Sequence, residues 1–528
     1  MSDETLTFLV LGVVVAVFIW DHLPVAAVAL GTALTLWATG VLSLEQALAG
    51  FGDPTVIFIA SLFVVSEALD ATGVTAWAGQ GLIARAGDSQ ARVVVLVLLL
   101  VAVLTALISV NGSVAALMPV VAVMAIRLRE SPSRLLIPLA FGAHAGSLLA
   151  LTGSPVNVIV SESADDAGVG RFGFFEFALV GVPLVAGTIA IVVVLGPRLL
   201  PDRTVRTGTR NFGDLAKTLV DQYRLEDDPD SLLGRRYGVA EVVIPPRSAL
   251  IGETAFPGMV TDSGDLVVMA VLRKGEHITE ETQLAVGDTM LLRGAWGALE
   301  YHLDDPEVLV VDEPARVRRQ VVPLGPGAKR SLLVLAGMVV LLVAGVVPPA
   351  VAGLLAAGAI VVSGVLTIDQ AYRGIAWTTV ILVAGMIPLS TAMTETGAAQ
   401  QLADNLVDAV GGPHTLLLGL VVLTFALGQL ISNMATALIM IPIAISAATG
   451  LGVSVQPVLM SLTVAAAGAF LTPVATPVNL MVMAPAGYRF GDYWKLGLPL
   501  LLVFFVAAVF VVPVFWPFGA WRASRGCA

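Results

Sequence analysis

LSLEQALAGFGDPTVIF, from Leu42 to Phe58, is the stretch that decides the fold, because it returns as LTIDQAYRGIAWTTVIL from Leu366 to Leu382. The likeness continues downstream. SVNGSVAALMP (109–119) and LTGSPVNVIV (151–160) have counterparts in ISNMATALIMIP (431–442) and LTPVATPVNLMV (471–482). Each copy therefore carries two polar interruptions of apolar sequence, a pattern typical of secondary transporters built from two repeats.

The composition predicts an integral membrane protein. Hydrophobic residues make up 57% of the chain and charged residues 13%, and the mean hydropathy is +0.91, whereas soluble domains carry about 25% charged residues. The single Cys527 excludes a disulfide framework. Acidic residues concentrate between Asp202 and Glu313, so the net charge of -11 does not point to a nucleic-acid partner. We expect a protein that is not an enzyme.

Apolar runs of about 20 residues predict the membrane spans. They lie near 5–20, 24–41, 54–70 and 175–199, with broken runs at 93–126 and 134–161, and again near 330–348, 350–366, 377–395 and 493–516, with broken runs at 413–446 and 455–483. The first broken run of each half is long enough for a re-entrant hairpin of two half-depth helices. Five full crossings per half remain, and an odd number inverts the second copy relative to the first.

We therefore predict an all-α polytopic membrane protein with two inverted repeats, each containing a re-entrant hairpin and a broken helix. Residues 1–199 form the first repeat with scaffold 1–87, and residues 329–528 form the second with scaffold 330–395. Residues 200–328 are an insert between them. Arginines and lysines flank the first hairpin and the insert, whereas 387–455 contains none. By the positive-inside rule the first hairpin and the insert then face the cytoplasmic side of the cell membrane, the second hairpin faces outward, and both termini lie outside.

The insert has the composition of a small α+β domain. From Tyr237 it shows short β-branched runs between Gly, Pro and Asp turn signals. RYGVAEVVIPPRSALIG, GDLVVMAVLRKGEHI and LAVGDTMLLRG resemble the C-terminal ligand-sensing module of Trk-type potassium-uptake regulators over about residues 237–300. The resemblance implies a regulatory domain with an unknown small ligand. The acidic stretch 211–234 is interpreted as a linker.

The polar interruptions have the composition of an ion site. Unwound backbone inside a membrane is tolerated where it lines a cavity, where carbonyls hold a cation and helix N-termini face an anion. Na⁺ prefers neutral oxygen ligands. The interruptions supply them from Ser109, Asn111, Ser113, Thr152, Ser154, Asn157, Ser432, Asn433, Thr436, Thr472, Thr476 and Asn479, with Gly112, Gly153 and Ala435 beside them. Packing of small residues between membrane helices is the alternative explanation for any single motif.

SPSRLLIPLAFGAHAGSLLALTGSPVNVIVS (131–161), ISNMATALIMIPIA (431–444) and FLTPVATPVNLMVMAPAGYRFGDYWKLGLPL (470–500) resemble the divalent anion–sodium symporter family. The insert is typical of its sulfate-transporter-like branch. The resemblance implies a homodimer in which a transport domain moves across the membrane as an elevator against a rigid scaffold. It also implies two sodium sites, each between a hairpin tip and a helix break, with the anion between the two tips.

The motifs and the resemblance together define two sets of candidate residues. Candidate sodium ligands are Thr105, Ser109, Asn111, Gly153, Ser432, Asn433, Thr472 and Ala475. Candidate substrate ligands are Asn111, Ser113, Ser154, Asn157, Asn433, Thr436, Thr476 and Asn479. The family's Ser-Asn-Thr triplet is Ser432-Asn433-Met434 in the second hairpin, and Asn111-Gly112-Ser113 in the first with an uncertainty of one residue.

The departures from the family pattern guide the choice of substrate. Met434 removes a hydroxyl that a two-carboxylate substrate would use, and the motifs contain no Lys or Arg. A small divalent oxyanion, sulfate first, is the preferred substrate. A di- or tricarboxylate is the alternative, and a ligand-gated channel or sensor is the alternative from another class. Glu67 and Asp70 lie near the end of a membrane span, so an interfacial or scaffold role is a better explanation for them than proton coupling.

Overall fold

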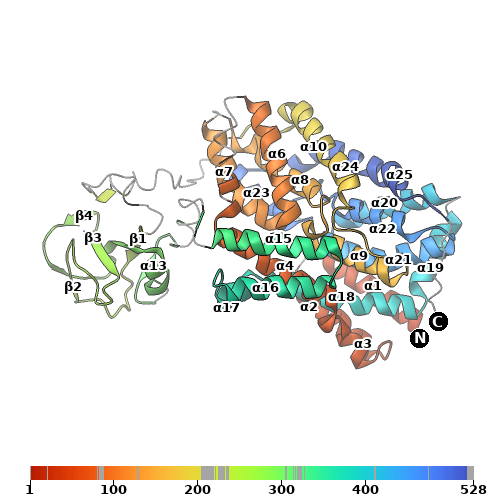
Figure 1. Ribbon diagram of the computed structural model, residues 1–528, viewed down its shortest axis with the longest axis horizontal. Coiled ribbons are helices and arrows are strands. Elements are labelled where there is room, and N and C mark those ends of the chain that lie inside the picture. Colours follow the sequence, from red (N-terminus) through yellow and green to blue (C-terminus); the bar gives the residue numbers. More distant parts are fainter. Residues whose placement is uncertain are drawn as a thin grey trace. The chain divides into compact units, whose positions relative to one another are not determined.

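The computed structural model describes residues 2–20, 22–75, 77–79, 81, 89–127, 130–203, 219, 222–223, 232, 237–303, 306–312, 314, 317, 324–325, 327–409, 412–473 and 475–519. The chain divides into two compact units (Figure 1). The membrane unit contains Met1–Leu69, Ala78–Thr207 and Lys329–Ala528, and the insert unit contains Asp70–Trp77 and Gly208–Ala328.

The membrane unit is helical, and its two halves repeat one order of elements. The first half contains α1 (Asp3–Trp20), α2 (Val25–Ala38), α3 (Leu44–Leu48), α4 (Pro54–Ala71), α6 (Gln90–Leu107), α7 (Val110–Arg127), α8 (Leu136–Gly146), α9 (Pro155–Asp166) and α10 (Ala178–Leu199). The second half contains α15 (Ala328–Ala344), α16 (Pro349–Val362), α17 (Ile368–Gly374), α18 (Trp377–Glu395), α19 (Ala398–Ala409), α20 (Pro413–Gly428), α21 (Asn433–Gly450), α22 (Val455–Ala466), α23 (Pro477–Ala486), α24 (Tyr493–Val506) and α25 (Val512–Phe515).

The predicted fold class is confirmed. Each hairpin run is split into two helices, α6 and α7 or α20 and α21, and each broken run is split into α8 and α9 or α22 and α23. Within the described residues, six helical stretches are long and apolar enough to cross a membrane: Asp3–Trp20, Leu44–Ala71, Ala178–Leu199, Trp377–Glu395, Asn433–Gly450 and Phe490–Phe515. The end of the scaffold predicted for residues 1–87, at 82–87, lies outside the described residues.

The two copies of the repeated stretch, at 42–58 and 366–382, form the same short helix for a local reason. Ser43 accepts a hydrogen bond from the N–H of Gln46, and the Gln46 side chain accepts one from the N–H of Ser43. Thr367 and Gln370 make the same pair of bonds at α17. Such a capping box satisfies the free N–H groups at the start of a short helix, so the two copies fold alike because they carry the same helix-start signal.

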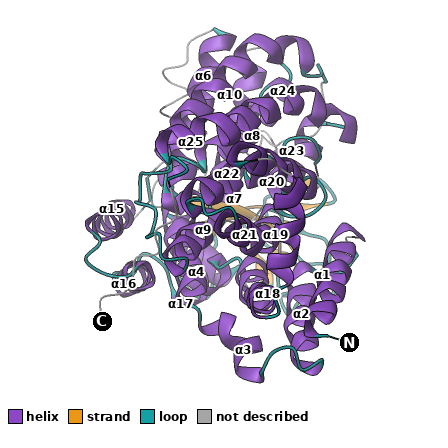
Figure 2. Cartoon of the chain, turned by 90° about the vertical axis from the view of Figure 1, so that its right-hand side faces the viewer, coloured by secondary structure: helices purple, strands orange, loops and turns teal. Residues whose placement is uncertain are grey.

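The repeats are interleaved in the membrane unit. Helix α9 of the first repeat packs against α21 and α22 of the second, and α23 of the second packs against α7 and α8 of the first. Figure 2 shows these helices gathered around one centre. Within each repeat the packing is also close: Gly181 of α10 lies against the backbone of Leu148, and Gly497 of α24 lies against that of Phe470, where neither glycine has room for a Cβ.

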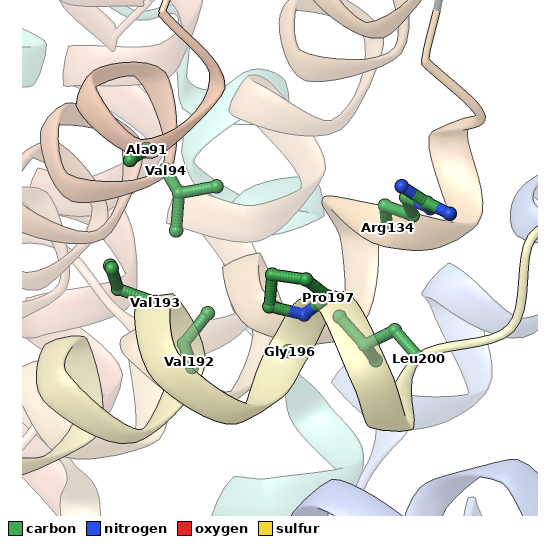
Figure 3. A pocket seen from close by; sticks show the side chains of 8 residues that line it. All are labelled: Ala91, Val94, Arg134, Val192, Val193, Gly196, Pro197 and Leu200. Atoms are coloured by element: carbon green, nitrogen blue, oxygen red, sulfur yellow. The ribbon is translucent and has the colours of Figure 1, made fainter.

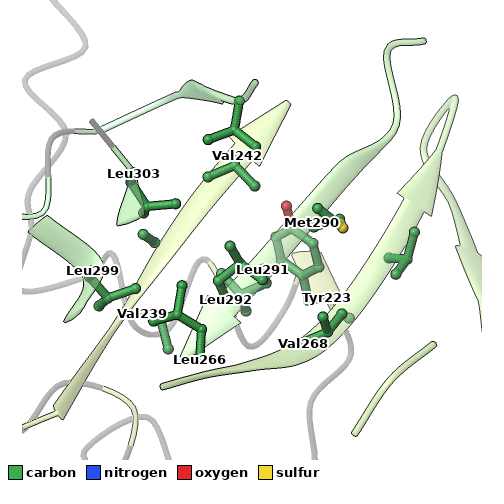
Figure 4. Packing of buried hydrophobic residues seen from close by; sticks show 14 of the residues in the cluster. Tyr223, Val239, Val242, Leu266, Val268, Met290, Leu291, Leu292, Leu299 and Leu303 are labelled. Carbon is green, nitrogen blue, oxygen red and sulfur yellow. The ribbon is translucent and has the colours of Figure 1, made fainter. Parts of the chain in front are cut away.

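The insert unit contains an antiparallel five-stranded sheet of order β4-β3-β6-β1-β7, and β2 pairs with β5. The strands are β1 (Tyr237–Val243), β2 (Thr254–Ala255), β3 (Leu266–Arg273), β4 (Glu276–Ile278), β5 (Thr282–Gln283), β6 (Thr289–Ala295) and β7 (Leu309–Val310), and α13 (Trp296–His302) follows β6. Apolar residues of β1, β3 and β6, several of them consecutive and so buried on both faces of the sheet, build an apolar core (Figure 4). This is the small α+β domain that the turn signals indicate.

Two segments differ from the expected domain plan. Leu219, Tyr223 and Leu232 lie in the stretch interpreted as a linker, yet all three are buried in the core of the insert unit. These apolar side chains stand out in an acidic segment, and Tyr223 also donates a hydrogen bond to Glu241. Asp70–Trp77, expected in the scaffold, belongs to the insert unit, where the N–H of Gly325 donates to the carbonyl of Thr72.

Candidate functional site

One cavity of about 220 Å³ collects residues from all four polar interruptions. Its polar lining residues are Ser109, Asn111, His144, Ser147, Ser154, Asn157, Thr378, Thr379, Ser432, Asn433, Thr463 and Thr476; its apolar lining includes Phe63, Leu382, Met434, Ala466 and Ala475. No Lys, Arg, Asp or Glu is among the described residues that line it. The cavity is therefore polar without carrying a formal charge.

Four helices begin at this cavity. Ser109, Ser154, Ser432 and Thr476 precede α7, α9, α21 and α23 and line the cavity with the first residues of those helices. Each side-chain oxygen accepts a backbone N–H from its own helix, from Gly112 at 3.1 Å, Val156 at 3.2 Å, Ala435 at 3.3 Å and Asn479 at 3.3 Å, respectively. A helix N-terminus carries about half a positive charge, so four of them give the cavity a positive potential.

An asparagine holds each helix break open in the same way. The side-chain amide of Asn157 donates to the carbonyls of Ser147 at 2.7 Å and Ala150 at 2.9 Å. The amide of Asn479 donates to the corresponding carbonyls, of Ala469 at 2.8 Å and Thr472 at 3.0 Å. Both side chains are buried, at 1% and 0% exposure. These two side chains, which we call the asparagine clamps, bond to carbonyls of the unwound backbone, one of which, that of Ala150, also accepts the N–H of Gly153 at 3.1 Å.

Threonine hydroxyls tie each break to the hairpin of its own repeat. Thr152 donates to the carbonyl of Ala106 at 2.8 Å, and Thr472 donates to that of Gln429 at 3.0 Å. In the second repeat the Gln429 side chain adds two more bonds, donating to the Gly468 carbonyl at 3.0 Å and accepting the N–H of Leu471 at 2.9 Å. Hairpin and break are thereby joined into one structural element in each repeat.

Several buried oxygens near the interruptions have no hydrogen-bond partner. They are Thr105 Oγ1, Ser113 Oγ and Asn157 Oδ1 in the first repeat, and Asn433 Oδ1, Thr436 Oγ1 and Asn479 Oδ1 in the second. Ser113 matches Thr436 when the two helix-capping serines Ser109 and Ser432 are aligned, and Asn157 matches Asn479. Buried unpaired acceptors are costly, and neutral oxygens of this kind are what a bound Na⁺ would satisfy.

The structure brings together part of the predicted site. Ser109, Asn111, Ser154, Asn157, Ser432, Asn433, Ala475 and Thr476 line the cavity, whereas Thr105, Ser113, Gly153, Thr436, Thr472 and Asn479 do not. All of the latter except Thr472 are buried, and Thr472 is half-buried. Four of these residues contribute the unpaired oxygens Thr105 Oγ1, Ser113 Oγ, Thr436 Oγ1 and Asn479 Oδ1.

The structure also corrects the alignment of the two hairpins. Ser109 and Ser432 accept the N–H three residues ahead in the same manner, so they are equivalent. Asn111 therefore matches Met434, and Val110 matches Asn433. The two asparagines therefore occupy different positions in their hairpins. The alignment of Asn111-Gly112-Ser113 with Ser432-Asn433-Met434 is out of register with the alignment that the serine caps define.

Five further residues line the cavity and are not predicted from the sequence. His144 lies on α8 and Ser147 directly follows that helix, Thr463 lies on α22, and Thr378 and Thr379 lie on α18. His144 had a signal, because it is the only ionisable residue in the apolar stretch 136–161 before Glu162. The threonines had none, since hydroxyls in membrane helices commonly bond to their own backbone.

A second hollow, of about 50 Å³, lies between α6 and α10 (Figure 3). It is lined by Ala91, Val94, Val192, Val193, Gly196, Pro197 and Leu200, with Arg134 as the polar residue. Arg134 already pairs with Glu130 at 3.2 Å and Asp202 at 3.0 Å. The hollow is small and apolar and holds none of the candidate residues, so the larger cavity is the candidate site.

Comparisons with known proteins match up to 98% of this chain. A family model described as "Citrate transporter" (CitMHS) matches residues 15–465 and 339–525. The "uncharacterized transporter YfbS" of Escherichia coli is 30% identical over 98% of this chain and 100% of that protein. An uncharacterized transporter of Synechocystis sp. is 26% identical over 96% of both chains. The "sodium/sulfate cotransporter 2" of Chlamydomonas reinhardtii is 24% identical over 60% of this chain and 37% of its own length.

Proposed function

We propose a substrate and a coupling ion for a chain that belongs to the citrate transporter family: it carries a small divalent oxyanion, sulfate first, together with Na⁺. The protein is a multi-pass membrane transporter of the citrate and sodium/sulfate cotransporter type, and not an enzyme. The identity of the anion, the coupling to sodium and the elevator movement are our proposals.

The convergence of four helix N-termini on one uncharged cavity carries this proposal. An anion in the cavity would receive backbone N–H groups and hydroxyls from Ser109, Ser154, Ser432 and Thr476. Helix N-termini bind oxyanions without help from a charged side chain. A cavity lined by such groups fits a compact tetrahedral anion that presents oxygens in several directions.

The unpaired buried oxygens support sodium as the coupling ion. Thr105, Ser113 and Asn157 in the first repeat, and Asn433, Thr436 and Asn479 in the second, contribute neutral oxygens. Within the described residues no cluster of three or more His, Cys, Asp or Glu could hold a metal ion. Na⁺ bound by neutral oxygens would also offset the charge of the anion, which the lining residues leave unneutralised.

The arrangement of helices supports alternating access by movement of the site. The hairpins and breaks of both repeats surround the cavity, and α2, α4 and α18 contribute Val25, Phe63 and Leu382 from outside those elements. We assign α2, α4 and α18 to the scaffold, and the hairpins and breaks to the moving part. A homodimer, a cytoplasmic insert and a regulatory ligand on that insert complete the proposed model.

A di- or tricarboxylate is the second candidate substrate. The description of the matching family favours it, whereas the cotransporter relative favours sulfate. Met434 is 9% exposed and lines the cavity. Its apolar side chain offers no hydrogen-bond donor to the second carboxylate group of a dicarboxylate. A hydrogen-bonding site discriminates strongly against ligands that leave its polar groups unpaired, and an apolar patch likewise disfavours an extra carboxylate.

Uptake of labelled sulfate into proteoliposomes, with and without an inward sodium gradient, tests the proposal. We expect sodium-dependent uptake that excess thiosulfate or molybdate inhibits better than succinate or citrate. Asn433→Ala should raise the sodium concentration for half-maximal uptake about tenfold or more, which corresponds to about 1.4 kcal/mol of lost binding.

Asn405→Ala is the matched control, because Asn405 is exposed on α19 and does not line the cavity; it should behave as wild type. Uptake driven by a proton gradient and indifferent to sodium would overturn the coupling ion. Stronger inhibition by citrate than by thiosulfate would establish the second candidate substrate. Anion currents without coupled uptake would show a channel.

A further inference from the structure

Among the described residues that line the candidate cavity, His144 is the one ionisable side chain. It lies on α8, whose residues are all buried, and it is itself 3% exposed. Its Nε2 atom lies 3.2 Å from the hydroxyl of Thr476, which caps α23 of the other repeat. The imidazole is thus a direct polar link between the two repeats, at a residue that faces the proposed anion.

The hydroxyl of Thr476 has one proton to give and two lone pairs to receive hydrogen bonds. One lone pair accepts the N–H of Asn479 at 3.3 Å. If Nε2 of His144 carries a proton, it occupies the second lone pair, and the Thr476 proton is then directed to the anion. If Nε2 is unprotonated, it takes the Thr476 proton, and the anion meets only a lone pair. The tautomer of His144 therefore decides whether Thr476 is a donor to the substrate.

We propose that His144 is a positioning residue for the anion, in the tautomer with a protonated Nε2, which fixes the Thr476 hydroxyl as a donor into the cavity. This inference rests on the proposed anion-binding function of the cavity. A positive cavity without lysine or arginine depends on oriented dipoles for its affinity, and a fixed hydroxyl adds one such dipole. Hydrogen bonds in a chain also strengthen one another.

The second repeat lacks this device. The asparagine clamps align Ser147 with Ala469 and Asn157 with Asn479, so His144 corresponds to Ala466, and Thr476 corresponds to Ser154. Ala466 lines the cavity but cannot donate to Ser154. The two helix caps thus share one backbone role and differ in the control of their hydroxyl protons. Ser154 serves as an internal comparison for Thr476.

The test is a double-mutant cycle on sulfate uptake by the purified full-length protein. His144→Leu leaves the Thr476 hydroxyl free to occupy three staggered positions in place of one, which predicts an increase of about threefold in the half-saturating sulfate concentration with an unchanged maximal rate. His144→Gln, whose side-chain N–H can replace Nε2–H, should restore most of the affinity. In a Thr476→Ala background, His144→Leu should have no further effect, whereas its effect should add to that of Ser154→Ala.

Each contrary result has a distinct meaning. Tighter sulfate binding by His144→Leu would show that Nε2 accepts the Thr476 proton and would overturn the proposal. Additive effects of His144→Leu and Thr476→Ala would show that the histidine acts elsewhere. If His144→Leu does not fold, His144→Gln carries the cycle with Thr476→Ala. If the wild-type protein takes up citrate and not sulfate, the cycle is measured with citrate, and if it takes up neither, the proposed function itself fails.

Discussion

The asparagine clamps make the sharpest prediction about how the site is held. Asn157→Leu replaces the amide by an apolar side chain of similar size and removes two hydrogen bonds, to the carbonyls of Ser147 and Ala150. A buried carbonyl left without a partner costs about 1–3 kcal/mol. The Ala150 carbonyl keeps the N–H of Gly153, so the substitution leaves the Ser147 carbonyl unpaired and should cost about 1–3 kcal/mol. Asn479→Leu removes the equivalent two bonds and should cost at least as much.

Thermal unfolding of the purified protein in detergent measures this effect. Domains of 150–250 residues lose about 2–4 °C of melting temperature per kcal/mol; the larger membrane unit loses less per kcal/mol, so a fall of several degrees is expected for each clamp variant. The substitutions should also abolish the stabilisation by sodium and sulfate, because each clamp carries an oxygen proposed to bind Na⁺.

Asn111→Leu is the matched control within the same cavity. Asn111 is exposed to the cavity, so its substitution should lower anion affinity and leave the melting temperature of the ligand-free protein within about 1 °C of wild type. Wild-type melting of both clamp variants would refute the reasoning. A loss at one clamp alone would refute the structural equivalence of the two breaks.

Two further predictions concern the insert. Burial alone would raise the pKa of the Asp288 carboxyl, but hydrogen bonds from Arg273 and from the Ala285 N–H hold this pKa below the usual value of 3.8. The pair of Arg273 and Asp288 therefore stabilises the domain above about pH 4, and this stabilisation is lost in stronger acid, where the carboxyl is protonated. Arg273→Met should therefore speed hydrogen exchange of β3 and β6 in the full-length protein most at neutral pH. Equal acceleration at pH 3 and pH 7 would contradict this dependence on the charge of Asp288. Replacing 211–312 by a flexible linker should retain stabilisation by sodium and sulfate while changing the uptake rate, because every cavity residue lies in the membrane unit; loss of that stabilisation in a folded protein would place the insert in the transport site.

The sequence was sufficient for the fold because each repeated signal has a local cause. The capping boxes at Ser43 and Thr367 start equivalent helices. Proline at the first position of α9 and α23 follows the caps Ser154 and Thr476, and such a signal resumes a helix after a break. These features depend on neighbours within a few residues, so the printed sequence contains all that is needed to find them.

Positions whose environment depends on contacts elsewhere in the fold could not be predicted from the sequence. Nothing in the residues next to Leu219, Tyr223 and Leu232 shows that they are buried in the core built by β1, β3 and β6. The register of the first hairpin could not be chosen from SVNGS, because the asparagines suggest one alignment and the serine caps another. The caps decide, since only one alignment gives both helices the same N–H to accept.

The comparison of the repeats separates residues that build the site from residues that can select its ligand. Caps, asparagine clamps and unpaired hydroxyls occur in both repeats, and such symmetric parts serve any anion that fits among four helix N-termini. Other cavity or tip positions are asymmetric, among them His144 opposite Ala466, Asn111 opposite Met434, Asn433 opposite Val110, and Gln429 opposite Ala106. The helix N-termini offer the same kind of donors from both repeats to a compact anion and to a longer dicarboxylate, so the side chains that differ between the repeats are where we expect the site to favour one of them. Substrate choice in this chain should therefore change through His144, Asn111 and Met434 before it changes through the clamps or the caps.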